Sequence, residues 1–358
     1  MQLLEYYQNQ IPQIENFVFR KCQLPHTQNI NLYGVRGSGK TSLVLDLITQ
    51  EDTEALLYID LDDAKLILEE LCLETLNTYI KEKKITLLVL DHYKEGYFDT
   101  LPEAETLILL SRTCINAPSL TPIELFPLDY EEFLAFEHSA SVNTGFNHFL
   151  RSGTLPLLAQ NQKTHNRSMK TFFQSAFSTN EQKLLLILAQ HHTKHLTTHQ
   201  IYSFAKAQFK VSKDWLYKTI KKFEEEKILL FIKDRYQKSG KKMLLFDFAF
   251  AKYLSLGQPF ILQFDTMIAL ALMKHHINAQ TLGIHGYITQ NNELIIPAPF
   301  ESEESLWIKS QNKFSIYKKH KIKKVSIITI NNSYEFSIEK LPFEALPFDE
   351  WSIISEEE

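Results

Sequence analysis

The stretch GVRGSGKT, residues 34 to 41, fits the spacing G-x-x-x-x-G-K-[ST] without a gap. Its glycines let successive backbone N–H groups turn inward around a phosphate, and the helix expected after the loop directs its positive end at the same anion. Lys40 is placed to reach the β and γ phosphates of ATP, and the Thr41 hydroxyl to bind Mg²⁺. The predicted cofactor-binding residues of this loop are Gly34, Val35, Arg36, Gly37, Ser38, Gly39, Lys40, Thr41 and Ser42.

Short apolar runs alternate with longer amphipathic ones around this loop, which is typical of a parallel sheet with crossover helices. The runs that indicate strands buried on both faces are residues 29–34, 54–60, 84–91 and 105–111, and the runs with helical spacing are residues 40–50 and 64–83. The loop follows the first strand and opens the first helix. We therefore predict an α/β fold with the parallel sheet of a P-loop NTPase.

A nucleotide bound with magnesium also needs a carboxylate at the end of a neighbouring strand. Two predicted strands end in an aspartate, at Asp60 and at Asp91. Asp91 follows the longer apolar run and comes one β-α unit later, which suits the adjacent central strand, so Asp91 is the predicted magnesium ligand together with Thr41. Asp60 is the alternative, and Asp62 and Asp63 are expected to cap the helix that follows.

His92 stands directly after Asp91, where many ATP-hydrolysing proteins carry a glutamate. A neutral imidazole can orient a water molecule, and Glu95 on the following loop is an alternative base. We therefore include His92, with Lys40 and Asp91, among the candidate catalytic residues and expect slow hydrolysis.

Residues 178–192, 197–209 and 212–227 have the pattern of three helices, with Ser212 placed as a helix cap. Two apolar runs, residues 228–234 and 242–250, indicate a hairpin after them. Three helices followed by a hairpin is the order of a winged-helix module. A polar segment, residues 160–170, is the candidate linker or exposed loop before it.

The composition, 358 residues with 44% hydrophobic and 23% charged, is that of a soluble globular protein with several domains. No run of 18 apolar residues and no signal peptide is present, so we expect a cytoplasmic protein without a membrane segment. Cys22, Cys72 and Cys114 are far apart and are expected to be reduced core thiols.

The loop, the Asp91 strand and the segments that follow resemble the archaeal-type ATPases, a branch of the AAA-like and STAND P-loop proteins. YGVRGSGKTSLVLDL is similar to the family's G-P-R-x-x-G-K-[ST] loop, including Arg36. Similar segments in the family's order are LLVLDHY, LILLSRT, IELFPLDYEEFLAF, FLRSGTLPLL and KKMLLFDFAFAKYL. The resemblance covers roughly residues 28–255.

This resemblance implies further roles. Ser111 would be the γ-phosphate sensor, and Pro156 would lie near the adenine, although Thr154 replaces the second glycine of the family's G-G-x-P turn. The family commonly ends in a domain related to restriction-type nucleases. Here Glu293 is the one acid in the expected position, and SLWIKS, residues 305–310, lacks the acid of a Glu-x-Lys strand, so we expect a degenerate domain without nuclease activity.

The net charge of -5 is unevenly distributed, because residues 205–242 are strongly basic, residues 309–324 hold seven Lys and no acid, and residues 335–358 are acidic. The winged-helix interpretation makes residues 212–223 a recognition helix and residues 233–242 a wing. Sequence-neutral DNA contact is then predicted for Lys213, Lys218, Lys221, Lys222, Lys238, Lys241 and Lys242. An ordinary solvated lysine face and a protein-docking module are the alternatives.

His191, His192, His195 and His199 include i, i+4 pairs, a spacing that can bind zinc. No acid or cysteine stands beside them, so a polar helix end is the favoured interpretation.

These inferences predict a P-loop ATPase or ATP-dependent switch that uses ATP and Mg²⁺. A non-hydrolysing ATP-binding scaffold for protein partners is the alternative, and the oligomeric state is left open. The predicted domains are a nucleotide-binding core at 1–115, a helical lid at 116–175, a winged helix at 176–256 and an α+β domain at 257–358.

Overall fold

A computed structural model describes residues 2–14, 17–49, 51–136, 142–160, 165–236 and 240–354. Its backbone contacts divide the chain into two units. The first unit is Met1–Pro127 with Glu225–Lys227, and the second is Leu128–Glu224 with Ile228–Glu358.

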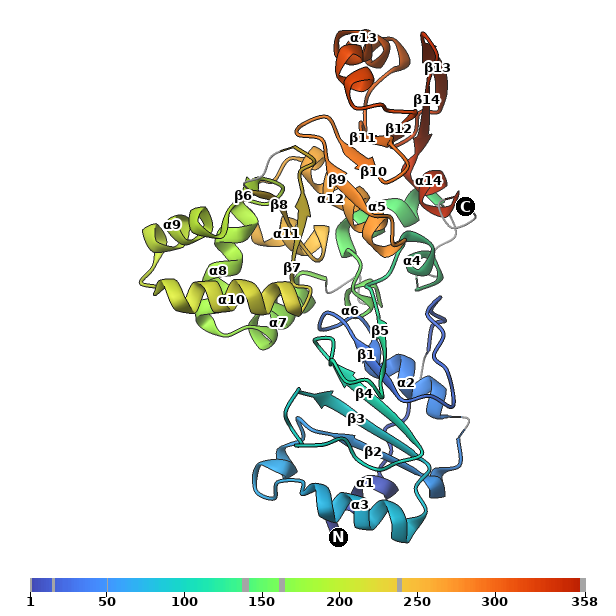
Figure 1. Ribbon diagram of the computed structural model, residues 1–358, viewed down its shortest axis with the longest axis vertical. Coiled ribbons are helices and arrows are strands. Elements are labelled where there is room, and N and C mark those ends of the chain that lie inside the picture. Colours follow the sequence, from blue (N-terminus) through green and yellow to red (C-terminus); the bar gives the residue numbers. More distant parts are fainter. Residues whose placement is uncertain are drawn as a thin grey trace. The chain divides into compact units, whose positions relative to one another are not determined.

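The first unit is built on a five-stranded parallel sheet with the strand order β2-β3-β4-β1-β5 (Figure 1). This is the α/β sheet of a P-loop NTPase, as the sequence predicts. The strands are β1 (Ile30–Tyr33), β2 (Leu56–Asp60), β3 (Leu87–Tyr93), β4 (Thr106–Ser111) and β5 (Thr121–Glu124). The helices are α1 (Gln2–Asn9), α2 (Lys40–Ile48) and α3 (Leu73–Lys83), with 3-10 turns at Thr53–Ala55 and Ala64–Ile67.

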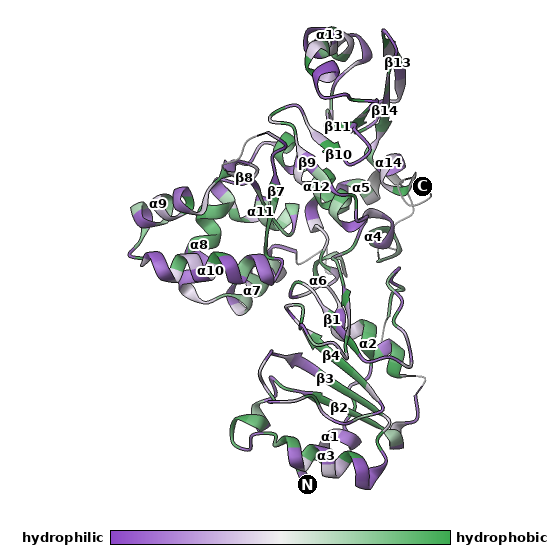
Figure 2. Ribbon diagram, in the orientation of Figure 1, coloured by the Kyte–Doolittle hydropathy of each residue, from purple (hydrophilic) through white to green (hydrophobic). Residues whose placement is uncertain are grey.

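The sheet is buried on both faces, because the strands are apolar along their whole length. Figure 2 shows these strands as mainly hydrophobic. Successive side chains of β3 lie on opposite faces of the sheet and belong to different hydrophobic clusters. Leu88 and Leu90 pack with α1 and α3, whereas Leu87 and Val89 pack with α2. The α2 side is the side on which the phosphate loop continues into its helix.

Three features of this unit differ from the sequence-based expectations. The helix expected over residues 64–83 begins only at Leu73, because Asp63 caps a separate 3-10 turn through the backbone N–H of Lys65. Strand β5 was not predicted; it contains Pro122, which edge strands tolerate. The strand that carries Asp91 is not adjacent to β1, because β4 pairs with both and lies between them.

The second unit begins with a group of helices, α4 (Tyr130–Phe136), α5 (Val142–Ser152), α6 (Pro156–Gln160) and α7 (His165–Ala176). Helix α7 occupies part of the predicted linker, so that prediction was wrong from residue 165 onward, and residues 161–164 lie outside the described residues. Apolar and aromatic side chains give α7 its buried face, with Met169 and Phe172 in the core.

The next elements follow in the order α8-β6-α9-α10-β7-β8, with the three strands in one antiparallel sheet. Their bounds are α8 (Thr179–Gln190), β6 (His195–Leu196), α9 (Thr198–Gln208), α10 (Lys213–Glu225), β7 (Leu229–Lys233) and β8 (Lys241–Leu245). The Ser212 hydroxyl accepts from the backbone N–H of Trp215, as expected of a cap. The second hairpin strand is shorter than predicted, since the Asp247 carboxylate caps a helix, α11 (Phe248–Leu254).

The C-terminal part contains a mixed six-stranded sheet of order β13-β14-β12-β11-β10-β9. Its elements are α12 (Phe260–Lys274), β9 (Ala279–Thr281), β10 (Tyr287–Thr289), β11 (Glu293–Pro297), α13 (Glu303–Lys319), β12 (Lys324–Thr329), β13 (Tyr334–Ile338), β14 (Leu341–Pro347) and α14 (Phe348–Ile354). Residues 305–310 lie in α13, so the comparison of SLWIKS with a nuclease strand was wrong. The strand that follows β11 in the sheet is β12.

Two further expectations concern the cysteines and the lack of a membrane segment. Cys72 and Cys114 are exposed, so the expectation of core thiols was wrong for them, while Cys22 is partly buried. Among the described helices, none has the length and apolar character needed to cross a membrane.

Candidate nucleotide site

The phosphate loop runs from the end of β1 into α2, as its sequence predicts. Gly37 and Gly39 have φ angles of 85° and 95°, in the left-handed region that favours glycine. Gly34 is required for a second reason, because a Cβ at this position would lie 2.4 Å from the carbonyl oxygen of Leu125. The loop conformation is therefore accessible only with glycine at these positions.

Lys40, the first residue of α2, is directed back across the loop. Its Nζ donates hydrogen bonds to the carbonyl oxygens of Gly34 (2.8 Å) and Val35 (3.0 Å). Burial lowers the pKa of Lys40 to about 8, and the nearby Asp91 carboxylate offsets part of this effect. The ammonium group is thus held inside the loop by neutral carbonyls that a phosphate can replace.

Asp91 lies at the carboxyl end of β3 and is 3% exposed. Its Oδ2 accepts hydrogen bonds from the Thr41 hydroxyl (2.7 Å) and from the Tyr58 hydroxyl of β2 (2.8 Å). Its Oδ1 accepts from the backbone N–H of His92 (2.7 Å). The carboxylate is therefore fixed against the hydroxyl at the start of α2.

His92 has a left-handed φ of 58°, which turns its side chain out of the apolar pattern of β3. Its Nδ1 lies 2.8 Å from Oδ1 of Asp60, the last residue of the neighbouring strand. The hydrogen bond to Asp60 raises the pKa of His92, and the charges of Asp91 and Asp62 raise it further against the effect of burial. The contact shifts the ring toward its protonated form, which cannot accept a proton from water, and the role of His92 as a general base stays a prediction.

The Asp60 carboxylate has a lowered pKa, because its hydrogen bonds with His92 and with the backbone N–H of Asp62 outweigh the effect of burial. Asp60, the alternative magnesium ligand, is thus engaged with His92. Asp91 is the carboxylate that contacts the phosphate loop.

Ser38 is fully buried in the loop, and its hydroxyl has no hydrogen-bond partner among the described residues. A buried hydroxyl without a partner is costly, and a phosphate oxygen would satisfy it. The backbone next to it is held by Arg20, whose guanidinium donates to the carbonyl oxygens of Ser38 (2.7 Å) and Phe126 (2.8 Å). Arg20 was not predicted, since it lies in an irregular segment and no motif includes it.

Arg112, directly after β4, adds positive charge to the site. Burial lowers the pKa of Arg36, and the charge of Arg112 lowers it further. The same arginine opposes the charge of Lys40. Arg112 thus acts on both Arg36 and Lys40 around the loop, an arrangement that suits a polyphosphate. Sequence reasoning quoted the segment that contains Arg112 but did not select this residue.

Ser111 lies at the end of β4, between β1 and β3, and is 3% exposed. Its hydroxyl donates to the carbonyl oxygen of Thr113 (2.6 Å) and accepts from the side-chain amide of Asn31 (2.7 Å). The hydroxyl is already engaged with these neighbours, and its role as a phosphate sensor stays a prediction.

The donor set fits a magnesium ion held by Thr41 and Asp91, because a hydroxyl and a carboxylate oxygen are ligands that Mg²⁺ prefers. Thr41 is the second residue of α2, and its hydroxyl donates a hydrogen bond to Asp91. Bound there, the ion would neutralise charge on the β and γ phosphates. Ser42 follows in the first turn of α2.

Other predicted residues lie in the second unit. Pro156 is the first residue of α6, and its place near the adenine stays a prediction. The side chain of Lys242 is only 12% exposed, and its Nζ lies 2.5 Å from Asp265 and 2.7 Å from the Tyr287 hydroxyl. Lys242 is therefore directed into the protein, and the sequence-based prediction that it faces DNA was wrong.

The remaining predicted DNA contacts differ in their environment. Lys222 forms an ion pair with Glu181 at 2.8 Å, and Lys241 lies 3.8 Å from Glu224. Lys238 lies outside the described residues. The other predicted contacts on α10 are Lys213, Lys218 and Lys221.

The histidines of the predicted cluster do not converge. His191 stacks on Phe204 with ring centroids 3.9 Å apart. His192 contacts Thr266 (2.7 Å), and His195 contacts Thr281 (2.9 Å). These separate contacts, together with the lack of a metal-binding group among the described residues, leave the zinc interpretation without support.

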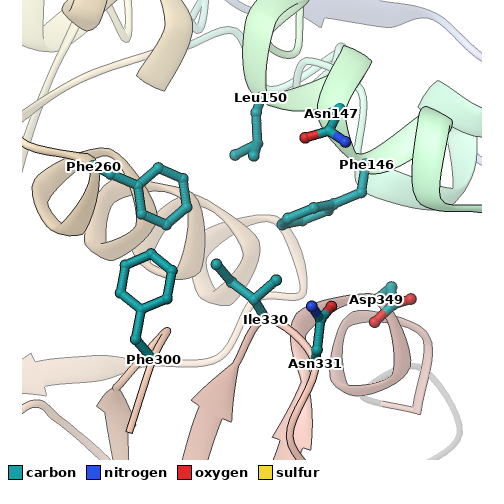
Figure 3. Close-up of a pocket in the computed structure, with 8 residues that line it drawn as sticks. All are labelled: Phe146, Asn147, Leu150, Phe260, Phe300, Ile330, Asn331 and Asp349. Carbon is teal, nitrogen blue, oxygen red and sulfur yellow. The ribbon is translucent and has the colours of Figure 1, made fainter.

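A cavity of about 540 Å³ lies within the second unit (Figure 3). Its lining is Phe146, Asn147, Leu150, Phe260, Phe300, Ile330, Asn331 and Asp349. The rings of Phe260 and Phe300 form one end, with centroids 5.5 Å apart, and Asn331 and Asp349 lie at the other. No residue of the candidate nucleotide site contributes to it.

Comparison with known proteins adds one family. The family described as AAA domain matches residues 26–96, which contain the phosphate loop, Asp91 and His92. No curated protein matches the chain. With the sheet order and the loop geometry, this match supports a P-loop ATPase domain in the first unit.

Solved structures with similarity include DNA complexes. The ORC1 protein of Aeropyrum pernix in complex with DNA is 13% identical, with 63% of this chain and 86% of that chain covered and a TM-score of 0.31. Drosophila ORC bound to AT-rich DNA and Cdc6 is 14% identical, with 61% and 82% covered and a TM-score of 0.18. Drosophila ORC bound to DNA is 11% identical, with 68% and 90% covered and a TM-score of 0.21.

Proposed function

We propose that the protein is an ATP-binding P-loop ATPase or ATP-dependent switch of the archaeal-type ATPase family. The observation that carries the proposal is the hydrogen bond of 2.7 Å between the Thr41 hydroxyl and Asp91. It joins the helix that begins at the phosphate loop to the carboxyl end of β3, the two sources of magnesium ligands in P-loop proteins.

ATP is the proposed nucleotide and Mg²⁺ the proposed ion. Lys40, now bonded to loop carbonyls, would contact the β and γ phosphates, and the unpartnered Ser38 hydroxyl would donate to a phosphate oxygen. Backbone N–H groups at the start of α2 would provide further donors. Thr41 and Asp91 would hold the ion, Ser111 would sense the γ phosphate, and Pro156 would lie beside the adenine.

Hydrolysis is proposed to be slow, because His92 occupies the position after the magnesium ligand and is paired with Asp60. The hydrogen bond with Asp60 raises the pKa of His92, which shifts the ring toward the protonated form that cannot accept a proton from water. The same observation favours a second candidate function, a non-hydrolysing protein that holds ATP as an on/off ligand for protein partners.

The chain after residue 115 is proposed to contain a helical lid, a winged helix and a degenerate nuclease-like domain, with the boundaries 116–175, 176–256 and 257–358. The order α8-β6-α9-α10-β7-β8 supports the winged helix. The exposed face of α10, with Lys213 and Lys218, is the proposed sequence-neutral contact with DNA. Nuclease activity is not proposed, since the one acid in the expected position, Glu293, accepts a hydrogen bond from the Ser326 hydroxyl.

The test is nucleotide binding followed by turnover. Wild-type protein should bind ATP with magnesium, and Lys40→Ala should lose that binding. Magnesium-dependent phosphate release above that of Lys40→Ala, measured with and without DNA, supports the ATPase. Tight ATP binding without turnover supports the scaffold, and a wild-type protein that binds no nucleotide contradicts both.

A further inference from the structure

The lysine-rich segment 309–324 has no part in the nucleotide site. It contains seven Lys and no acidic residue, and it covers most of α13 and the turn into β12. A charge run of this kind is often a solvated helix face whose cations pair with nearby acids. The ion pairs of the segment therefore show how many of its lysines are left without an acidic partner among the described residues.

Three lysines of the segment are neutralised by acids from other elements. The pairs are Lys309–Glu301 at 2.5 Å, Lys318–Glu339 at 2.7 Å and Lys324–Glu344 at 2.7 Å. For Lys313, Lys319, Lys321 and Lys323, no ion pair is formed within the part of the chain that the structure describes. Four lysines of the segment thus remain outside these ion pairs.

The turn after β7 brings a fifth cation to the same place. The Tyr236 ring lies 4.3 Å from the ring of His320, and its hydroxyl contacts His320 Nδ1. Arg235 donates to the side chain of Asn292 (3.4 Å), while the backbone N–H of Lys323 donates to the carbonyl of the same residue (2.9 Å). Two separate elements therefore share one surface.

The lowered pKa values of two histidines, His320 and His285, indicate positive charge around them. The pKa of His320 is lowered by burial and then by the charges of Lys319 and Arg235. The pKa of His285 is lowered by burial and then by Lys313 and His320. The α13 basic surface is therefore defined by Arg235, Lys313, Lys319, Lys321 and Lys323.

We propose that the α13 basic surface binds the phosphate backbone of duplex DNA. Its cations come from the β7 turn, α13 and the turn into β12, so they are spread over an extended surface, as an extended polyanion requires. An acidic protein partner would need an apolar centre to bind stably. Here Arg235 and the backbone of Lys323 instead contact the polar residue Asn292, and Tyr236 contacts His320.

This surface differs from the face of α10 in its charge balance. The last turn of α10 continues into Glu224 to Glu226, and Lys222 is paired with Glu181. No acid interrupts residues 309–324. The inference is independent of nucleotide binding and adds a second DNA-binding surface to the one proposed on α10, and separate variants test the two surfaces.

The experiment measures the affinity for a fluorescent duplex DNA at a series of salt concentrations. The test variant carries Lys319→Ala, Lys321→Ala and Lys323→Ala, three exposed residues whose loss should leave the fold intact. Each phosphate contact contributes about 0.9 to the slope of log affinity against log salt. The slope should therefore fall by about 2.7 in this variant if all three contact phosphates.

The matched control carries Lys81→Ala, Lys83→Ala and Lys84→Ala, which change the net charge equally but lie in the first unit at the end of α3. A second variant carries Lys213→Ala and Lys218→Ala on α10. An unchanged slope in the α13 variant, or a fall confined to the α10 variant, overturns the inference. So does a wild-type protein that binds polyglutamate but not DNA. ATP binding, measured on the same samples, reports separately on the proposed nucleotide site.

Discussion

The Thr41 hydroxyl donates a hydrogen bond to the Asp91 carboxylate across 50 positions of sequence. Thr41 belongs to the helix that begins at the phosphate loop, and Asp91 to a strand that is separated from β1 by β4. The contact shows that the loop and the acidic strand end form one site, with Tyr58 as the second donor to the same carboxylate oxygen.

The pH dependence of nucleotide affinity should report on Lys40. Burial sets the pKa of Lys40 to about 8 in the free protein, and bound phosphates would raise it by stabilising the ammonium. Affinity should then be insensitive to this group below pH 8 and fall by up to about tenfold per pH unit above it. Titration with a fluorescent ATP analogue from neutral to alkaline pH measures this.

Lys40→Arg is the control for that experiment, because a guanidinium keeps its proton over the whole range. It should remove the alkaline fall in affinity even if its overall affinity is lower. An identical fall in Lys40→Arg and in the wild type would mean that another group causes the dependence.

His92→Glu should increase magnesium-dependent ATP turnover. A carboxylate at this position restores a base that can accept a proton, and positioned bases contribute about 10²- to 10⁴-fold. Repulsion from Asp60 would also turn the new side chain away from its present contact. Phosphate release under saturating ATP measures the change.

His92→Gln is the matched control, since it keeps hydrogen bonding without a base. Equal turnover in the Glu and Gln variants would show that the position does not limit hydrolysis. The scaffold function would then gain support from the same data, provided that both variants bind ATP.

Acid should destabilise the second unit through His192. His192 is 3% exposed; its Nδ1 accepts from the backbone N–H of Leu245, and its Nε2 contacts the Thr266 hydroxyl. Thr266 donates onward to the Leu262 carbonyl, so Nε2 carries the ring proton. A second proton on Nδ1 would oppose the N–H of Leu245.

Burial lowers the pKa of His192 from 6.5 to about 3. The unfolded chain therefore binds one proton more than the folded chain between these values, and the free energy of unfolding falls as the pH falls through this window. The expected loss is about 1.4 kcal/mol per pH unit. Urea unfolding of His192→Gln should show a shallower pH dependence than His199→Gln, whose histidine is exposed; equal slopes would contradict this role.

Gly153→Ala should strongly destabilise the second unit. A Cβ at Gly153 would lie 2.4 Å from an Asp247 carboxylate oxygen, and the φ of 74° is already unfavourable for alanine. The same carboxylate accepts from the backbone N–H and the hydroxyl of Thr154 and caps α11, so its displacement breaks several contacts. Thermal unfolding measures the loss.

Gly257→Ala is the control, because Gly257 has a similar φ of 72° but no atom within 4 Å of the added Cβ. It should cost only the backbone strain, about 1–2 kcal/mol. If both alanine variants lost equal stability, the contact with Asp247 would have no additional effect.

The sequence predicts those parts of the fold that local patterns determine. The phosphate loop needs glycines at fixed spacing, and strands buried on both faces are apolar throughout, so β1 to β4 and α2 were predictable. Strand β5 was missed because Pro122 is unusual in a strand and is tolerated here only by the edge position.

The contacts that organise the site are not local and were missed. Tyr58 reaches Asp91 from another strand, and Arg20 holds the loop from an irregular segment upstream. The prediction that Lys242 contacts DNA was also wrong, because the sequence shows the number of lysines in a segment but not the ion pair of Lys242 with Asp265. The burial of Lys242 depends on α12, which contains Asp265, and the sequence around residue 242 does not indicate this contact.

Pro122 has a consequence for self-association. The backbone N–H groups of Thr121 and Leu125 donate to the carbonyl oxygens of Asn29 and Tyr33, on the β1 side. Because backbone N–H directions alternate along a strand, the backbone nitrogen of Pro122 points away from β1, toward the open edge of the sheet. Proline has no N–H to offer there. A strand from another molecule would therefore lack a hydrogen-bond donor at Pro122, within an edge strand of four residues. This missing donor disfavours the addition of further strands to the sheet and so disfavours aggregation.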